Sequence, residues 1–462
     1  MKNPMRPDMW NRLGTSFLPF ADAASAELPL GRILRLSLFQ VSVGMCAVLL
    51  TGTLNRVMIV ELKMSATLVA LMVSIPLLFA PLRALIGHKS DTHRSVLGWK
   101  RVPYIWFGTL MQFGGLAILP FALLIMSGGG ASGPVAGQIG AALGFLLVGA
   151  GMHTTQTAGL ALATDLATPE KAPRVVALLY VMLLVGMMIS ALVIGRLLVN
   201  FTPTHLVQIV QGVAALTAIL NVTALWKQEA RDPRRTAIAA EHPQFATVWA
   251  TFIAVPATRR LLVAIGLGAA AFAMQDVLLE PYGGQVLGLS VGATTSLTAL
   301  WALGTLTGFA LAAKSLTSGS DPHRLAGNGG VAGIAAFLMI IFAAPSQSVG
   351  LLCLGATTMG FGGGLFSVGT LTAAMALSKD GRSGLALGAW GAVSATCAGT
   401  AILLGGLLRD VMATSSGYTA VFLTEIVLLL AMLIAIGPLV RRVGGAFETY
   451  PTGKFGLTEF PT

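Results

Sequence analysis

Long apolar runs separated by short polar segments dominate the chain. A helix needs about 20 predominantly apolar residues to cross about 30 Å of hydrocarbon. Runs of that length recur from residue 36 onward and predict twelve membrane-spanning helices, at residues 36–60, 64–87, 103–126, 137–163, 174–197, 205–226, 260–282, 291–313, 325–344, 349–377, 384–408 and 418–440.

The longest polar connection, residues 227–259, lies between the sixth and seventh of these runs. The pattern therefore predicts two six-helix halves, residues 36–226 and 260–440, joined by that linker. Residues 1–35 precede the first span and residues 441–462 follow the last. Between residues 10 and 20, aromatic and apolar side chains alternate with arginine, which favours an element at the membrane interface or against a neighbouring membrane protein.

Composition agrees with this interpretation. Apolar residues make up 55% of the chain and charged residues only 10%, against about 25% charged residues in an average soluble protein. The net charge of +11 is spread over the polar connections rather than gathered on one basic face. It therefore predicts membrane lipids as surroundings and no nucleic-acid partner.

The basic residues are unevenly distributed between alternate connections. If the N-terminus is cytoplasmic, 25 of the 29 Lys and Arg residues fall on the cytoplasmic side, and the remaining four are Arg56, Lys63, Arg196 and Arg409. Cytoplasmic loops of membrane proteins carry such an excess. We therefore expect both termini to be cytoplasmic.

A polar segment near the outer end of the first span recurs in the seventh: Asn55, Arg56 and Glu61 in the first, and Gln275, Asp276 and Glu280 in the second. Two six-helix halves that echo each other resemble the major facilitator superfamily, whose halves are related by an axis along the membrane normal. The resemblance implies an all-α polytopic membrane protein with twelve transmembrane helices in two pseudo-symmetric halves.

The connection after the second span also resembles that superfamily, through the inner-loop motif Gly87, Asp91, Arg94, Lys100 and Arg101. After the fourth span, Asp165 and Arg174 resemble its usual partner segment. The resemblance implies that this loop braces the two halves at their inner face.

Ionisable side chains inside a span cost about 2.5–3.5 kcal/mol each on insertion scales. The charged residues of the repeated segment, Arg56, Glu61, Asp276 and Glu280, therefore require an explanation. One interpretation is an interfacial cluster partly exposed to water. The other is a cross-half ion pair or polar gate, with Arg56 facing Asp276, that closes the periplasmic side.

His153 is the one histidine well inside a predicted span, in the polar stretch from Gly151 to Gln156. A neutral imidazole can ligate the magnesium of a chlorin pigment. A buried histidine more commonly donates a hydrogen bond to a neighbouring helix. Both interpretations stay open, and we expect no bound metal ion.

The other unusual residues within spans have simpler interpretations. Glu425, Arg196 and Arg409 suggest snorkelling or local pairing. Cys46, Cys353 and Cys397 suggest packing residues. The glycines favour close helix contacts, although the run from Gly360 to Gly364 could also make room for a flat ligand; the G-x-x-x-G pairs are Gly140/Gly144, Gly304/Gly308, Gly360/Gly364 and Gly384/Gly388.

The sequence contains no phosphate-binding P-loop, no H-E-x-x-H motif and no nucleophile elbow. We expect no enzymatic activity. Without an ATP-binding motif, any transport would be secondary or facilitative.

Longer motifs resemble a narrower family, the PucC/LhaA proteins of purple phototrophic bacteria. The resemblance extends from about residue 17 to residue 440 and rests on these stretches: Phe17 to Ala24, Leu34 to Gln40, Gly52 to Leu62, Ser90 to Ser95, Gly98 to Tyr104 and Gln275 to Gly284.

Membership in that family implies a role in assembling light-harvesting antenna complexes, LH1 or LH2, in the intracytoplasmic inner membrane. It implies bacteriochlorophyll as the carried pigment, with carotenoid as a further candidate. The implied partners are antenna α and β polypeptides, with the reaction centre–LH1 core and bacteriochlorophyll synthase as further candidates. Two other functions stay open: a secondary transporter that uses Asp276 or Glu280 as its coupling carboxylate, and a scaffold that docks antenna polypeptides.

Overall fold

A computed structural model describes residues 24–25, 28–78, 99–126, 133–168, 171–229, 253–376, 383–412 and 414–440. The described residues form an all-helical bundle without strands. Eleven of their helices are long and apolar enough to cross a membrane, and the apolar helix Ala66–Leu77 is shorter. The predicted second span, 64–87, continues beyond the described residues, so the count of twelve spans and the cytoplasmic location of the termini stay predictions.

The N-terminal half begins with a first span built from five consecutive helical pieces. They are α2 (Leu30–Leu36), α3 (Leu38–Ala47), η2 (Val48–Thr53), α4 (Leu54–Arg56) and η3 (Val57–Glu61). The rest of this half consists of α5 (Ala66–Leu78), α7 (Val102–Met126), α8 (Gly133–Leu166), α9 (Ala172–Leu197) and α10 (Pro203–Leu225).

The C-terminal half has a similar order, with its first span also in pieces: α12 (Pro256–Ala273), η5 (Met274–Val277) and α13 (Leu279–Val286). Its other helices are α14 (Val291–Thr317), α15 (Pro322–Ala343), α16 (Val349–Ala376), α17 (Ser383–Val411) and α18 (Thr414–Ile436), followed by the short η6 (Gly437–Leu439).

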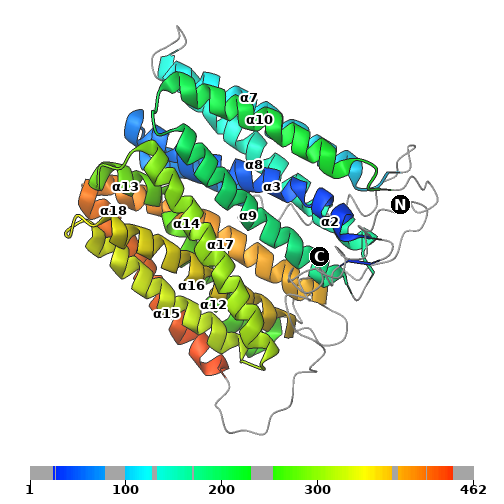
Figure 1. Cartoon of the computed structure of the whole chain (residues 1–462). Helices are drawn as coiled ribbons and strands as arrows, with labels where there is room; N and C mark the ends of the chain where they lie inside the picture. Colours follow the sequence, from blue (N-terminus) through cyan, green and yellow to red (C-terminus); the bar gives the residue numbers. More distant parts are fainter. Residues whose placement is uncertain are drawn as a thin grey trace, which may run out of the picture.

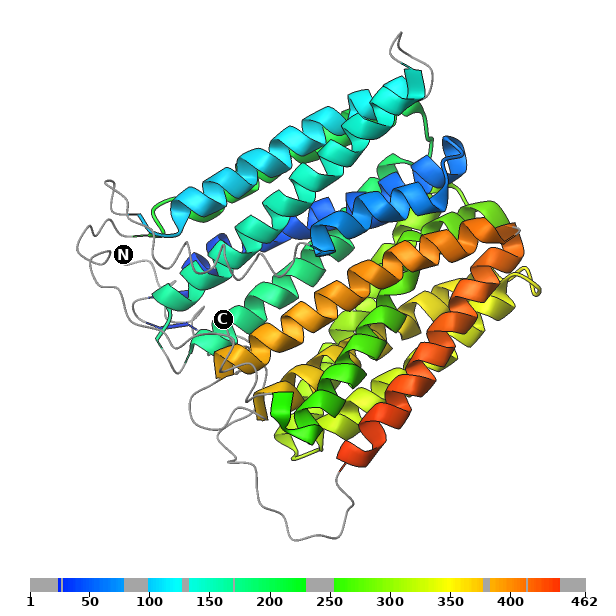
Figure 2. The ribbon, with the colours of Figure 1, turned by 180° about the vertical axis from the view of Figure 1, so that it is seen from behind.

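The two halves lie side by side, with their helices converging at one end (Figures 1 and 2). That end carries Glu61, Leu289 and Val411, and we call it the outer end because the charge distribution predicts that it faces the periplasm. Toward the inner end, where α2 begins, the ribbons of the two halves spread apart. Helix α5 packs against α17 and α9 against α14, and these two pairs join the halves.

Glycines bring several helix backbones into direct contact. A Cβ atom on Gly308 of α14 would lie 2.5 Å from the carbonyl oxygen of Phe361 in α16. One on Gly364 of α16 would lie 2.8 Å from the carbonyl oxygen of Thr305. Close packing is therefore the role of these glycines, since another helix fills the space that a flat ligand would need.

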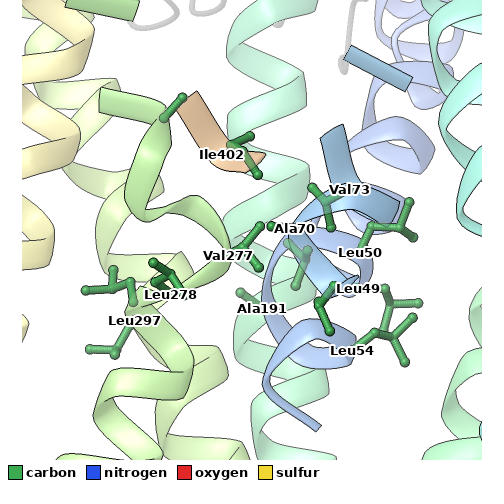
Figure 3. Close-up of a cluster of buried hydrophobic side chains, with 14 of the residues drawn as sticks. Leu49, Leu50, Leu54, Ala70, Val73, Ala191, Val277, Leu278, Leu297 and Ile402 are labelled. Carbon is green, nitrogen blue, oxygen red and sulfur yellow. The ribbon is translucent and has the colours of Figure 1, made fainter. Parts of the chain in front are cut away.

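One apolar cluster extends across both halves (Figure 3). Leu49 and Leu54 of the first span and Ala70 of α5 lie near Val277 of η5 and Ile402 of α17, and all are buried. This cluster lies beside the polar residues of the broken spans. The halves therefore share a continuous core at the level of those breaks.

Candidate functional site

The first span of each half loses regular α-helical geometry at the level of its polar residues. In the N-terminal half, α4 lies between two π-helical turns, η2 and η3. In the C-terminal half, the 3-10 turn η5 separates α12 from α13. Such turns often mark functional sites, and transporters place their binding sites at interrupted helices. The two broken segments form the candidate site.

A glycine in each half accommodates a charged side chain of the other. Gly52 of η2 lies against Glu280 of α13, so a Cβ atom there would overlap the Glu280 carboxyl group. One turn further out, a Cβ atom on Gly284 would lie 3.0 Å from Nη2 of Arg56. We call these four residues the glycine interlock, because each pair lets the two spans approach closely.

Arg56 makes its ion pair within its own half. Its Nη1 donates to Oε1 of Glu61 at 2.5 Å, and its Nη2 donates to the carbonyl oxygen of Leu289 at 3.0 Å across the halves. The cross-half acid whose charge acts on Arg56 is Glu280. The arrangement thus differs from the Arg56–Asp276 ion pair, which was one of the possibilities left open, because the π-helical turn brings residues five apart onto the same face.

The remaining polar residues of the repeated segment link the two breaks. The side-chain amide of Asn55 donates to the carbonyl oxygen of Asp276 at 3.3 Å, and also to the carbonyl oxygen of Thr51. The Gln275 amide donates to Oδ1 of Asp276 at 2.6 Å. Asn55, Gln275 and Glu280 are buried, and Arg56 is only 4% exposed.

Of the two interpretations left open by the sequence, exposure to water fits Glu61, whose side chain is 39% exposed. It does not fit the buried members. Most of the cluster is buried where the two halves meet, and its role as a polar gate stays a prediction. Glu280 contributes by accepting a hydrogen bond from Thr298 of α14 at 2.7 Å.

A second polar contact at the outer end joins α5 to α17. The carboxyl group of Asp410 accepts hydrogen bonds from the backbone N–H groups of Ala66 and Thr67, at 3.1 and 2.7 Å, and from the Thr67 hydroxyl at 2.7 Å. An acidic residue of one half thereby caps the N-terminus of a helix in the other, where the helix dipole favours negative charge.

Arg409, next to this acid, extends the contact. It pairs with Asp410 at 2.9 Å, donates to Oε1 of Gln285 at 2.6 Å and lies over the ring of Tyr418. Gln285 in turn donates to the carbonyl oxygen of Ile59 in the other half at 3.4 Å. Local pairing was expected for Arg409, and the next residue, Asp410, provides it. The Gln285 partner and the Asp410 contact with α5 were missed, because they join residues more than 100 positions apart.

The inner-loop residues that the structure describes make contacts within the N-terminal half. Arg101 donates to Oδ2 of Asp165 at 3.0 Å. Glu229, at the start of the linker, accepts from the backbone N–H groups of Lys100, Arg101 and Val102 at 2.7 to 3.0 Å and so caps α7. Sequence reasoning missed Glu229. Arg174 lies at the start of α9, and Gly87, Asp91 and Arg94 lie outside the described residues.

His153 is half-buried on α8. Close to it in sequence, the carbonyl oxygen of Gly151 and the hydroxyl of Thr155 accept hydrogen bonds from the Gln112 amide of α7 at 3.2 and 2.8 Å. His153 is two residues from each of these, so it lies on another face of α8 than the contact with α7. Its role as a pigment ligand stays a prediction.

Comparison with known proteins identifies the family. The chain is 58% identical over 404 residues to Protein PucC of Rhodovulum sulfidophilum, covering 86% of this chain and 89% of that protein. It is 52% identical over 472 residues to an "Uncharacterized protein in puhA-bchM intergenic region" of Rhodobacter capsulatus, covering 98% and 99% of the two chains.

Solved structures confirm the fold, which is that of transporters of the major facilitator type. One similar structure is a bacterial homologue of the human lysosomal transporter Spinster in an inward-facing, unoccupied conformation. It has a TM-score of 0.66 and 14% identity, with 91% of this chain and 96% of that chain covered. The family model described as "PUCC protein" matches residues 53–444. The chain therefore belongs to the PucC protein family.

Proposed function

We propose that this protein assists the assembly of light-harvesting antenna complexes, LH1 or LH2, by binding bacteriochlorophyll and delivering it to newly inserted antenna α and β polypeptides. The observation that carries the proposal is the high identity to PucC over most of the chain. The site of action would be the bacterial inner membrane, including its intracytoplasmic folds. The role is non-enzymatic, since the protein would hold and transfer pigment without altering its bonds.

The arrangement of the halves supports a carrier that changes conformation. The outer end is sealed by the glycine interlock and by the Asp410 contact, whereas the helices spread apart toward the inner end. A carrier needs a closed side and a side that can admit or release its cargo. The seal at the broken spans supplies the first of these.

The test is to purify the tagged protein from a phototrophic host in mild detergent. We expect a near-infrared absorption band of bacteriochlorophyll and co-purification of antenna polypeptides, with carotenoid, reaction-centre subunits and bacteriochlorophyll synthase as further candidates. A colourless preparation without partners, from cells that make pigment, would contradict the proposal.

His153→Leu tests the candidate pigment ligand in the same preparation. We expect reduced pigment in this variant and unchanged pigment in the control His205→Leu, because His205 is exposed at the start of α10. Equal pigment in both variants would remove His153 from the proposal and leave delivery itself standing.

A second candidate function is secondary transport of a small solute, with Asp276 and Glu280 as coupling carboxylates. The observation that favours it is a buried acceptor: Oε2 of Glu280 has no hydrogen-bond partner in the described part of the chain. This candidate predicts proton-dependent solute uptake into vesicles that Glu280→Gln abolishes. Uptake that does not depend on a proton gradient would exclude it.

A further inference from the structure

Glu425 lies in the middle of α18 and is 0% exposed. Among the described residues, no group forms a hydrogen bond of ordinary geometry with either of its carboxyl oxygens. Helix α18 packs against the 3-10 turn η5, where the backbone of Gln275 and the carboxyl group of Asp276 interact with Glu425. Of the two explanations given for Glu425, snorkelling or local pairing, snorkelling is wrong, because a snorkelling side chain would reach the membrane surface.

The nearest basic groups on the elements packed against α18 lie away from Glu425. These elements are α12, α15, α17, η5 and η6, and η5 contributes Asp276. On α17, Arg409 and Asp410 pair with each other beside Tyr418, which is seven residues from Glu425, or about 10 Å along the helix.

The basic residues of the other two helices lie further off. Ring contact between Phe337 and Phe422 places the middle of α15 opposite Glu425. His323 and Arg324 are therefore about 15 Å away, in the first turn of α15. Arg259 and Arg260 lie near the start of α12, about 22 Å along the helix axis from Gln275.

A carboxylate ion at this position would have no basic partner among the residues that the structure describes. It would be removed from water, without a strong donor, and next to a second acid, and each of these conditions disfavours the charged form. Two carboxyl groups in one site avoid the repulsion when one of them holds a proton. Glu280, one turn beyond Asp276, instead has Thr298 and the charge of Arg56 beside it.

We propose that Glu425 and Asp276 form a proton-binding site inside the C-terminal half, occupied by a proton while the outer end is closed. The geometry that carries the proposal is a fully buried carboxyl group of α18 that has no ordinary hydrogen bond from the described residues, on a helix that packs against the broken seventh span. This inference does not depend on pigment binding, because it concerns the proton alone.

The proposed site is connected to the seal between the halves. The carbonyl oxygen of Asp276 accepts from Asn55 of the N-terminal half, and its carboxyl group accepts from Gln275. Loss of the proton would leave an unpaired charge beside this contact and so disfavour the closed arrangement. Alkaline pH should therefore loosen the outer end.

A lipid-soluble carbodiimide, which modifies protonated carboxyl groups in apolar surroundings, tests the site directly in the purified full-length protein. Peptide mass mapping should find the adduct on Glu425, with labelling that falls as the pH is raised. The exposed Glu61 provides the matched control, since a water-soluble carbodiimide should label it and leave Glu425 unmodified. Sodium chloride at constant pH should have no effect.

The infrared band of a protonated carboxylic acid supplies an independent measurement, and Glu425→Gln should remove it. Two outcomes would overturn the proposal. The first is the absence of both the adduct and the band at Glu425. The second is protection of Glu425 by sodium ions, which would make the pair a cation site.

The conformational consequence is measured with spin labels on Thr204→Cys and Ser346→Cys, at the outer ends of the two halves, after the native cysteines are replaced. The distance between the labels should increase with pH in the parent protein and stay short in Glu425→Gln, which keeps the neutral form. A pH response that persists unchanged in Glu425→Gln would assign it to another group and refute the coupling.

Discussion

Gly52→Ala tests whether the glycine interlock closes the outer end. The new Cβ atom would overlap Oε1 of Glu280 and lie 3.1 Å from its Cδ and 3.2 Å from Oγ1 of Thr298. The Glu280 carboxyl group must then move and give up its 2.7 Å hydrogen bond with Thr298. Leaving a buried polar group unsatisfied costs about 1–3 kcal/mol. That free energy shifts the equilibrium from closed toward open by about 5- to 150-fold.

The measurement is the spin-label distance between Thr204→Cys and Ser346→Cys, which should lengthen or broaden in Gly52→Ala. Gly114→Ala is the matched control, because no described atom outside the local backbone of its own helix lies within 4 Å of its Cβ position. Adding Glu280→Ala should relieve the overlap, so the two substitutions should be non-additive in a double-mutant cycle. If Gly52→Ala and Gly114→Ala gave the same distance distribution and the same melting temperature, the interlock would not be what closes the outer end.

Three further predictions concern helix ends. Asp410→Ala removes the cap of α5, so the closed arrangement should lose about 1–2 kcal/mol and the same label distance should lengthen; an unchanged distance would show that the cap is dispensable. Glu229→Ala uncaps α7 and should lower thermal stability by about 1–2 kcal/mol in a melting experiment, with a smaller loss in Glu229→Gln, and equal losses would contradict a charge effect. Lys63 has a φ of 52°, in the left-handed region that strains residues other than glycine. Lys63→Gly should therefore raise the free energy of unfolding by up to about 1 kcal/mol in a melting experiment. A fall would mean that the lysine side chain stabilises the fold by more than its backbone strain costs.

The sequence was a good guide to the spans and to the segments that carry polar residues. The predicted span 349–377 corresponds to α16, Val349–Ala376, and the repeated polar segments of the first and seventh spans do meet. Hydrophobic length fixes a membrane helix locally, because each span must satisfy its own backbone hydrogen bonds. The exact ends of the helices were less predictable. The first span begins at Leu30 rather than residue 36.

The partners of the polar residues were harder to predict. In a regular α-helix, residues five apart point about 140° away from each other. The pairing of Arg56 with Asp276 was instead considered because the two residues have opposite charges in the repeated segment. The π-helical turn η3 brings the side chains of Arg56 and Glu61 onto the same face of the span. No sequence pattern predicted this turn. Asp410 and Glu425 were missed as site residues for a related reason, because their surroundings come from other helices.

The Arg56–Glu61 pair also has a consequence for how the chain is made. The N-terminal half leaves the ribosome first, so for a time Arg56 is in the membrane without Leu289 or the rest of the C-terminal half. Because its counterion lies five residues further along the same span, the nascent segment can enter the bilayer as a neutral pair. Early insertion of the first span then does not have to wait for the second half of the protein.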